Sequence, residues 1–235
     1  MNTVIDPRAS IRRSQLYRWH MGRNATFVDF GERTFVDRYG DLEQEIYAAQ
    51  RLGFCDLSLL PRHGVIGRGA SKFLRAKGMR LPELPNTSEV QENHDLVVRL
   101  SPEEFVCLRL SSLSQGASYE SDAWQDTAEQ VAFVVPNSDS HCLFSVSGEK
   151  ASTMFSKVCA VDLRGRSFAN GNVAQTSIAR VNSIIIRHDF ELTENFFVLA
   201  ATSATEYLWG CILDAADEFD GSPIGIAALR ANARY

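Results

Sequence analysis

The chain has 235 residues, 24 of them basic and 29 acidic, and carries a net charge of −5. Hydrophobic residues make up 45% and charged residues 23%, a composition typical of folded globular proteins that excludes collagen-like, disordered and membrane-spanning chains. The mildly acidic balance argues against a general nucleic-acid-binding surface. A chain of this length forms one large domain or two small ones.

Cysteine usage indicates the compartment. The five cysteines occur singly, with no CxxC pair, at Cys55, Cys107, Cys142, Cys159 and Cys211. An odd number of scattered cysteines argues for a reducing environment and against a disulfide framework or a structural zinc site. The N-terminus also lacks the apolar segment of a secretory signal. We therefore expect a cytoplasmic protein with no bound metal and no association with a membrane.

Residues 1–23 form a basic arm, with five arginines and one acidic residue, so the arm carries +4 and the remainder −9. Apolar and aromatic side chains lie among the arginines, at Ile11, Leu16, Tyr17, Trp19 and Met21. Arginine and aromatic residues are enriched at protein interfaces. We expect the arm to order against another subunit, so that its deletion leaves a folded domain; the alternative is that it packs on its own domain.

Between residues 40 and 130 the apolar spacing predicts two helices and three strands. The helices occupy 42–52 and 70–77, each ended by a glycine, and the strands occupy 62–67, 96–100 and 105–110. Residues 114–130 are polar and have no apolar period, so a weak helix and a surface loop are expected there.

The same order of elements returns after residue 130. We predict a strand at 141–146, a helix from 151, a strand pair at 183–187 and 196–200, and a helix at 202–218. A shift of 81 residues superposes Gly67 on Gly148, and a shift of 91 superposes Phe105 on Phe196. Repeated units of this kind pack together because each alone leaves an apolar face exposed.

The predicted fold class is therefore α/β (α+β), with two pseudo-repeated halves whose antiparallel sheets are backed by helices. We expect four segments along the chain. They are a basic arm and lead-in (1–39), a first half (40–130), a second half (131–220) and a C-terminal tail (221–235).

A scan for catalytic motifs is negative. The sequence contains no GxGxxG, GxxxxGK[ST], HExxH or GxSxG string, and its five histidines are isolated from one another. The acidic cluster Asp214, Asp217, Glu218 and Asp220 follows an amphipathic helix, where carboxylates usually form a solvated face. Residue chemistry alone thus indicates no enzyme class.

Short strings in the central and C-terminal part occur in an order found in one known family. They are LSPEEF (100–105), SG (147–148), KVCAVDL (157–163), RSF (166–168), QTSIA (175–179), IR (186–187), LW (208–209) and DEF (217–219), with RRS (12–14) near the start. Together they resemble the gamma subunit of heterotetrameric sarcosine oxidases.

A second set of strings covers the two ends of the chain. They are FVDFG (27–31), YG (39–40), Glu43, GFCDLS (53–58) and PIGIAALR (223–230). This set is similar to the glycine cleavage T-protein, a folate-binding aminomethyltransferase whose superfamily includes the gamma subunit. The resemblance implies the T-protein's folate-binding fold for this chain, without the T-protein's C-terminal domain.

The T-protein's functional residues transfer poorly. Its Asp-Asp-Leu string, which presents an aspartate at the folate, corresponds to HDL (94–96), so only Asp95 remains. Its pterin-binding glutamate falls on Phe197, whose ring cannot accept those hydrogen bonds. The resemblance implies Asp95 as the one candidate catalytic residue, and Tyr39, Asp95 and Arg187 as remnants of a folate site. The later arginine of the T-protein falls on Leu229.

Three interpretations follow from these resemblances. The first, which we prefer, is a small, non-catalytic gamma-type subunit of a sarcosine oxidase-like complex that oxidises an N-methyl amine in one-carbon metabolism. The second is a free-standing tetrahydrofolate-dependent aminomethyl- or methyltransferase of the T-protein family. The third is a protein of the iron–sulfur maintenance type, whose KGCYxGQ motif is reduced here to KVCA (157–160).

The first interpretation carries its own expectations about ligands and partners. The resemblance implies alpha- and beta-type subunits as partners, with flavin only on those subunits and the active site outside this chain. We expect no tightly bound cofactor on this chain itself, and leave tetrahydrofolate open as a ligand.

Overall fold

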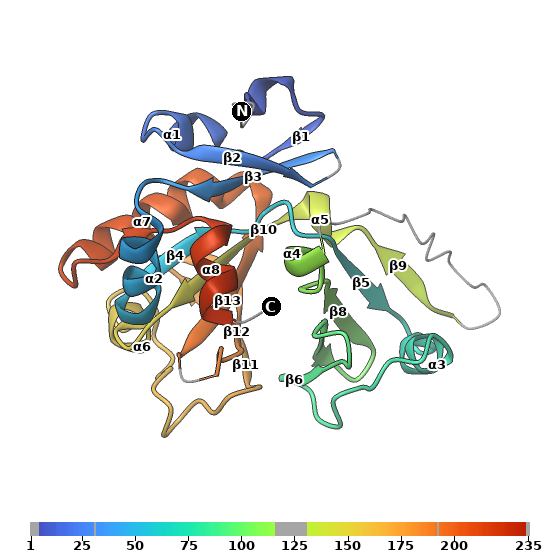
Figure 1. The fold of residues 1–235 in the computed structure, drawn as a ribbon. Coiled ribbons are helices and arrows are strands. Elements are labelled where there is room, and N and C mark those ends of the chain that lie inside the picture. Colours follow the sequence, from blue (N-terminus) through green and yellow to red (C-terminus); the bar gives the residue numbers. More distant parts are fainter. Residues whose placement is uncertain (1–4, 31, 116–130, 192, 234–235) are drawn as a thin grey trace.

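The computed structural model describes residues 5–30, 32–115, 131–191 and 193–233. Within these residues the chain forms an α+β fold with one small and two larger sheets (Figure 1). Most of the predicted surface loop at 114–130 lies outside the described residues. No helix of the described part is long and apolar enough to cross a membrane.

The N-terminal residues form a layer across one end of the two larger sheets (Figure 1). Its sheet has the strand order β1-β3-β2, with β1 parallel and β2 antiparallel to β3. The elements of this layer are the 3-10 helix η1 (Pro7–Ala9), β1 (Arg12–Arg13), α1 (Tyr17–Met21), β2 (Thr26–Phe30) and β3 (Arg33–Arg38).

The first large sheet has the strand order β6-β7-β8-β5-β9, and all its pairs are antiparallel. Helix α3 follows β5 and covers one face of the sheet, and its apolar residues join those of the strands. The elements are β5 (Arg62–Ile66), α3 (Ala70–Ala76), β6 (Thr87–Val90), β7 (Leu96–Ser101), β8 (Glu104–Leu108) and β9 (Phe133–Val135).

The second large sheet has the strand order β11-β12-β13-β10-β4-β14 and is antiparallel apart from the β14–β4 pair. Its elements are β4 (Gly53–Asp56), β10 (His141–Ser147), α6 (Ala151–Phe155), β11 (Val173–Ile178), β12 (Val181–Arg187), β13 (Asn195–Ala201), α7 (Thr205–Asp217) and β14 (Ser222–Pro223). The remaining elements are α2 (Leu42–Arg51), α4 (Ser112–Gln115), α5 (Asn137–Ser140), η3 (Thr202–Ala204) and α8 (Ile226–Ala233).

The two large sheets repeat the same topology. Strands β6-β7-β8-β5 and β11-β12-β13-β10 lie in the same order, and α3 follows β5 as α6 follows β10. The repeat inferred from the sequence is therefore present in the fold. The fifth strand, however, is exchanged, because β4 pairs with β10 and β9 pairs with β5. A cut between residues 130 and 131 thus does not separate the two sheets, and the four segment limits stay a prediction.

Two glycines allow the exchanged strands β4 and β9 to enter their sheets. Gly67 and Gly148 have φ of +115° and +111°, where a side chain is strained. A Cβ on Gly67 would overlap the carbonyl of Val131, and one on Gly148 would overlap the carbonyl of Arg51. Val131 and Arg51 each stand just before an exchanged strand. The 81-residue shift superposes these two glycine positions. Glycine is required at both because the backbone before an exchanged strand approaches it closely.

The described residues form three apolar clusters. One lies between the two sheets and includes Leu96, Val98, Ile186 and Phe197. A second fills the outer face of the second sheet beneath α6 and α7, with Trp209 at its centre. The third lies between α3 and the outer face of the first sheet. Alternation along β7 explains the division, since successive side chains point to opposite faces of a sheet.

The basic arm packs on its own chain. Leu16 is 2% and His20 1% exposed, and Trp19 contacts Trp209 edge-on with ring centroids 5.3 Å apart. The structure therefore shows the alternative that the arm packs on its own domain, and its deletion would expose part of the core. The physical reason is that the apolar members of the arm complete the core beneath α7, whereas the arginines Arg8, Arg13, Arg18 and Arg23 stay exposed.

The C-terminal helix is tied to the start of α2 by one buried carboxylate. Glu45 accepts hydrogen bonds from the backbone amides of Tyr39 (2.6 Å), Gly40 (2.9 Å) and Gly225 (2.7 Å). Buried charge is tolerated when hydrogen bonds replace its lost hydration. This contact positions α8 against α2 and brings residues 226–233 into the cluster between the two sheets.

Candidate functional site

Tyr39, one of the three expected remnants of a folate site, belongs to the N-terminal layer. Its hydroxyl lies 2.7 Å from Nδ1 of His20, and burial raises its pKa well above the usual value. Nε2 of His20 in turn lies 3.0 Å from Oδ2 of Asp56, which also accepts a hydrogen bond from Ser14. Tyr39 therefore helps to anchor the arm.

Arg187 lies at the end of β12, where it is nearly buried. Its guanidinium forms ion pairs with Asp189 and Glu194, both at 3.0 Å, and donates to the carbonyl of Phe168 at 2.8 Å. Burial acts to lower the pKa of Arg187, but the two carboxylates outweigh burial and raise it. The five-donor guanidinium is thus already engaged by its own chain.

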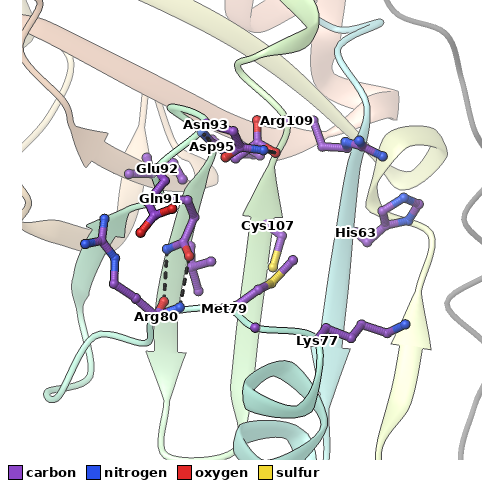
Figure 2. A pocket seen from close by; sticks show the side chains of 14 residues that line it. His63, Lys77, Met79, Arg80, Gln91, Glu92, Asn93, Asp95, Cys107 and Arg109 are labelled. Atoms are coloured by element: carbon purple, nitrogen blue, oxygen red, sulfur yellow. Dashed lines mark hydrogen bonds between the residues drawn. The ribbon is translucent and has the colours of Figure 1, made fainter.

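Asp95 immediately precedes β7. Its Oδ1 accepts hydrogen bonds from the backbone amide (3.0 Å) and the hydroxyl (2.7 Å) of Ser111, and Asn93 donates to Oδ2 at 2.9 Å. Asp95 lines a cavity together with Val97 and Cys107, on the face of the first sheet that is turned away from the second sheet (Figure 2).

The structure does not bring the three expected site residues together. Tyr39 lies in the N-terminal layer, Asp95 on the outer side of the first sheet, and Arg187 in the second sheet. No hydrogen bond or ion pair described in the structure joins any two of them. Successive side chains of a strand point to opposite faces of the sheet. A match of short sequence strings therefore does not show on which face a residue lies.

The position of the expected pterin-binding glutamate is filled by an aromatic cluster. Phe197 is 0% exposed, and its ring stacks on His188, with centroids 5.9 Å apart and planes 20° from parallel. Phe190 contacts the same ring edge-on at 6.1 Å. Phe197 also belongs to the apolar cluster between the two sheets. At this place the chain offers apolar surface in place of a carboxylate acceptor.

Sequence reasoning missed the histidine beside Phe197. Burial and the nearby His94 both lower the pKa of His188, against the opposing effect of Asp189. His188 therefore stays neutral near pH 7 and supplies one N–H and one lone pair. An isolated histidine gives no sequence signal, since only the fold shows that His94 and His188 come near each other.

The cavity that Asp95 lines has a volume of about 720 Å³ and opens beside α3. Figure 2 shows its walls, formed by the turn at 77–80, the turn at 91–95, and strands β5, β7 and β8. Met79, Val97 and Cys107 provide apolar surface, while His63 and Arg109 provide polar groups.

The chemistry of this cavity is that of binding rather than nucleophilic attack. Burial raises the pKa of Cys107 to about 12, so the group is a thiol and not the reactive thiolate. Burial and the Arg109 charge lower the pKa of His63. Among the described residues, no group of three or more His, Cys, Asp or Glu side chains is placed to hold a metal ion.

Comparison with known proteins gives two relatives from sarcosine oxidases of Corynebacterium. The sarcosine oxidase subunit gamma of strain P-1 is 22% identical over 156 residues, which is 66% of this chain and 73% of that subunit. A chain of the heterotetrameric sarcosine oxidase of strain U-96, solved in complex with pyrrole 2-carboxylate, has 19% identity and a TM-score of 0.59. That match covers 76% of this chain and 92% of the other.

A third match covers nearly the whole chain. The glycine cleavage system aminomethyltransferase T of Bartonella henselae has 17% identity and a TM-score of 0.71, over 95% of this chain and 62% of that protein. The GCVT N-terminal domain family model matches residues 16–235. Both resemblances noted in the sequence are thus confirmed, and the chain belongs to the GCVT N-terminal domain family.

Proposed function

We propose that this protein is a non-catalytic, gamma-type subunit of a sarcosine oxidase-like complex that oxidises an N-methyl amine in one-carbon metabolism. The observation that carries the proposal is the buried Phe197. It places a packed phenyl ring, stacked on His188, where the T-protein resemblance implies a carboxylate. A pterin edge facing that ring would lose a hydrogen-bond partner, at a cost of about 1–3 kcal/mol.

Two further observations support the same role. Asp95 is held by Ser111 and Asn93, and Arg187 is held by Asp189 and Glu194, so both have structural partners within the chain. The relatives include a subunit named for sarcosine oxidase and a chain of a heterotetramer. We infer alpha- and beta-type partner subunits that carry the flavin, with the active site outside this chain.

The test is affinity purification of the tagged chain from its native cell. The expected result is co-purification of two or more larger subunits, with flavin absorbance and sarcosine-dependent oxygen uptake in the complex. The chain purified alone is expected to show neither. Recovery of the chain without partners, from cells that oxidise N-methyl amines, contradicts the proposal.

A second measurement separates a subunit from a folate enzyme. Titration of the isolated chain with tetrahydrofolate in a calorimeter should give no stoichiometric isotherm at tens of micromolar protein, an order of magnitude at which micromolar binding is measurable. A low-micromolar isotherm that disappears in Asp95→Ala would establish the transferase interpretation instead.

A further inference from the structure

We propose that the cavity beside α3 is a binding site for a small organic monocarboxylate with an apolar body, in which Arg109 pairs with the carboxylate. This site is independent of the proposed subunit role, and it lies on the outer face of the first sheet, away from Phe197. Its volume of about 720 Å³ is that of a small-molecule pocket.

The repeated topology shows that this face of the first sheet differs from its counterpart. His63 pairs with Cys107 across β5 and β8, as Phe144 pairs with Val198 across β10 and β13. The 91-residue shift also places Arg109 at the position of Ala200. Three apolar positions of the second half are therefore occupied in the first half by a histidine, a thiol and an arginine.

The polar residues of the first sheet and the apolar residues of the second match the elements that cover the two faces. In the second half α7 lies over this face, and Trp209 packs on Phe144 with ring centroids 5.0 Å apart. In the first half the equivalent positions line the cavity, and α3 is the helix among the described residues that packs on the same face. Polar side chains beneath a packed helix would cost free energy, whereas beside a cavity they can meet a ligand.

Arg109 is the group best placed to bind an anion. It is half-buried, and no described residue accepts a hydrogen bond from its guanidinium or forms an ion pair with it. Asp95, which lines the same cavity, is engaged by Ser111 and Asn93 instead. In Figure 2 the Arg109 side chain extends away from Asp95 and over β5, on the side where His63 stands.

The surroundings define the class of anion. A guanidinium binds a carboxylate through two parallel hydrogen bonds. Met79, Val97 and the Cys107 thiol offer apolar surface for the rest of the ligand. Three cationic side chains and two carboxylates line the cavity, namely Lys77, Arg80, Arg109, Glu92 and Asp95, so their net charge of +1 is balanced by one negative charge on the ligand. A monocarboxylate with an apolar body meets all three conditions.

The test uses benzoate as the probe and benzamide, its neutral analogue of equal size, as the matched control. Each is titrated into the full chain, and binding is followed by amide and arginine Nε chemical shifts in NMR. We expect benzoate to shift the signals of Val97, Cys107 and Arg109 with a Kd of about 0.1–1 mM, a range typical of so small a ligand. Benzamide should bind at least about tenfold more weakly.

Two variants decide whether Arg109 is responsible. Arg109→Gln should weaken benzoate binding by about tenfold or more, because it removes the bidentate charged contact. Arg75→Gln alters an exposed arginine of α3 that does not line the cavity, and should leave binding unchanged. Thermal unfolding confirms that each variant is folded.

Three results would overturn the site. The first is the absence of chemical-shift changes up to about 20 mM benzoate, which is well above the expected Kd. The second is binding of benzamide as strong as that of benzoate. The third is unchanged benzoate binding in folded Arg109→Gln. His63→Phe provides an independent check, since it introduces the side chain type that the second half has at the equivalent position. Binding should weaken in this variant as well.

Discussion

At the scale of single residues, Asp56 is a buried carboxylate with several hydrogen-bond partners. Asp56 lies in β4 and is hydrogen-bonded to His20, to Ser14 and to the backbone amide of Ser58. Burial alone would raise its pKa, but the interaction with His20 and the hydrogen bonds from Ser14 and Ser58 outweigh burial, so the pKa of Asp56 lies below its usual value. The ionised form is therefore the one that the fold stabilises.

The depressed pKa of Asp56 predicts an acid-dependent contribution to stability. Because the pKa is lower in the folded than in the unfolded chain, this stability is present above about pH 4 and is lost as the pH falls through the folded value. Asp56→Asn should lower the free energy of unfolding at pH 7 by about 1–3 kcal/mol. It should also flatten the loss of stability on acidification.

Urea unfolding between pH 7 and pH 3, read by circular dichroism, measures both effects. Asp217→Asn, at an exposed position near the end of α7, serves as the control and should change neither quantity by more than about 0.5 kcal/mol. An acid limb in Asp56→Asn as steep as in the unaltered chain would show that other groups produce it.

At the scale of elements, the N-terminal arm is part of the fold and also presents a basic surface. Its apolar side alternates with exposed arginines, so one short segment contributes both to the core and to the surface. The guanidinium of Arg23 lies 3.7 Å from the ring centroid of Trp19, and Trp19 packs on Trp209. The exposed arginines are thus held in place by the buried contacts of the arm.

Leu16 provides the test of this dual role. Leu16→Ala should lower the free energy of unfolding by about 2–5 kcal/mol, because it leaves a cavity in the core beneath α7. Ile11→Ala, at a position 76% exposed, should change it by no more than about 0.5 kcal/mol. Chemical denaturation gives both numbers. If the two variants prove equally stable, the arm does not anchor the domain.

At the scale of the whole molecule, the exchange of β4 and β9 links the two sheets, and we expect them to unfold as one cooperative unit. Each sheet takes its fifth strand from the other side of the repeat, and the cluster between the sheets draws on both. Small proteins organised in this way unfold in a single transition when neither part can complete its core alone.

A split chain tests this cooperativity. The fragment 131–235 lacks β4, α2 and the arm, so we expect it to remain largely unfolded by circular dichroism and NMR. Mixing it with fragment 1–130 should restore the signals of the intact chain, since the exchanged strands can then pair. A fragment 131–235 that folds by itself would show that the second sheet does not need the strand it receives.

Local sequence signals predicted part of the secondary structure, the repeat and the family, but not elements such as β4, β9 and α8. Predicted strands at 96–100, 183–187 and 196–200 lie within β7, β12 and β13, and the glycine shift of 81 residues revealed the repeat. These features depend on local signals, namely apolar periodicity and a backbone conformation that favours glycine. The family resemblance rested on ordered strings, which do not depend on contacts between distant residues.

Which residues lie close together depends on the folded arrangement of the whole chain. The exchange of β4 and β9, the burial of the arm and the separation of Tyr39, Asp95 and Arg187 all depend on contacts between residues far apart in the chain. The cavity with Arg109 likewise arises from the packing of α3 and its following turn on one face of the sheet. Apolar periodicity predicts which face of a helix or strand is buried. The element that covers this face depends on the packing of the whole chain.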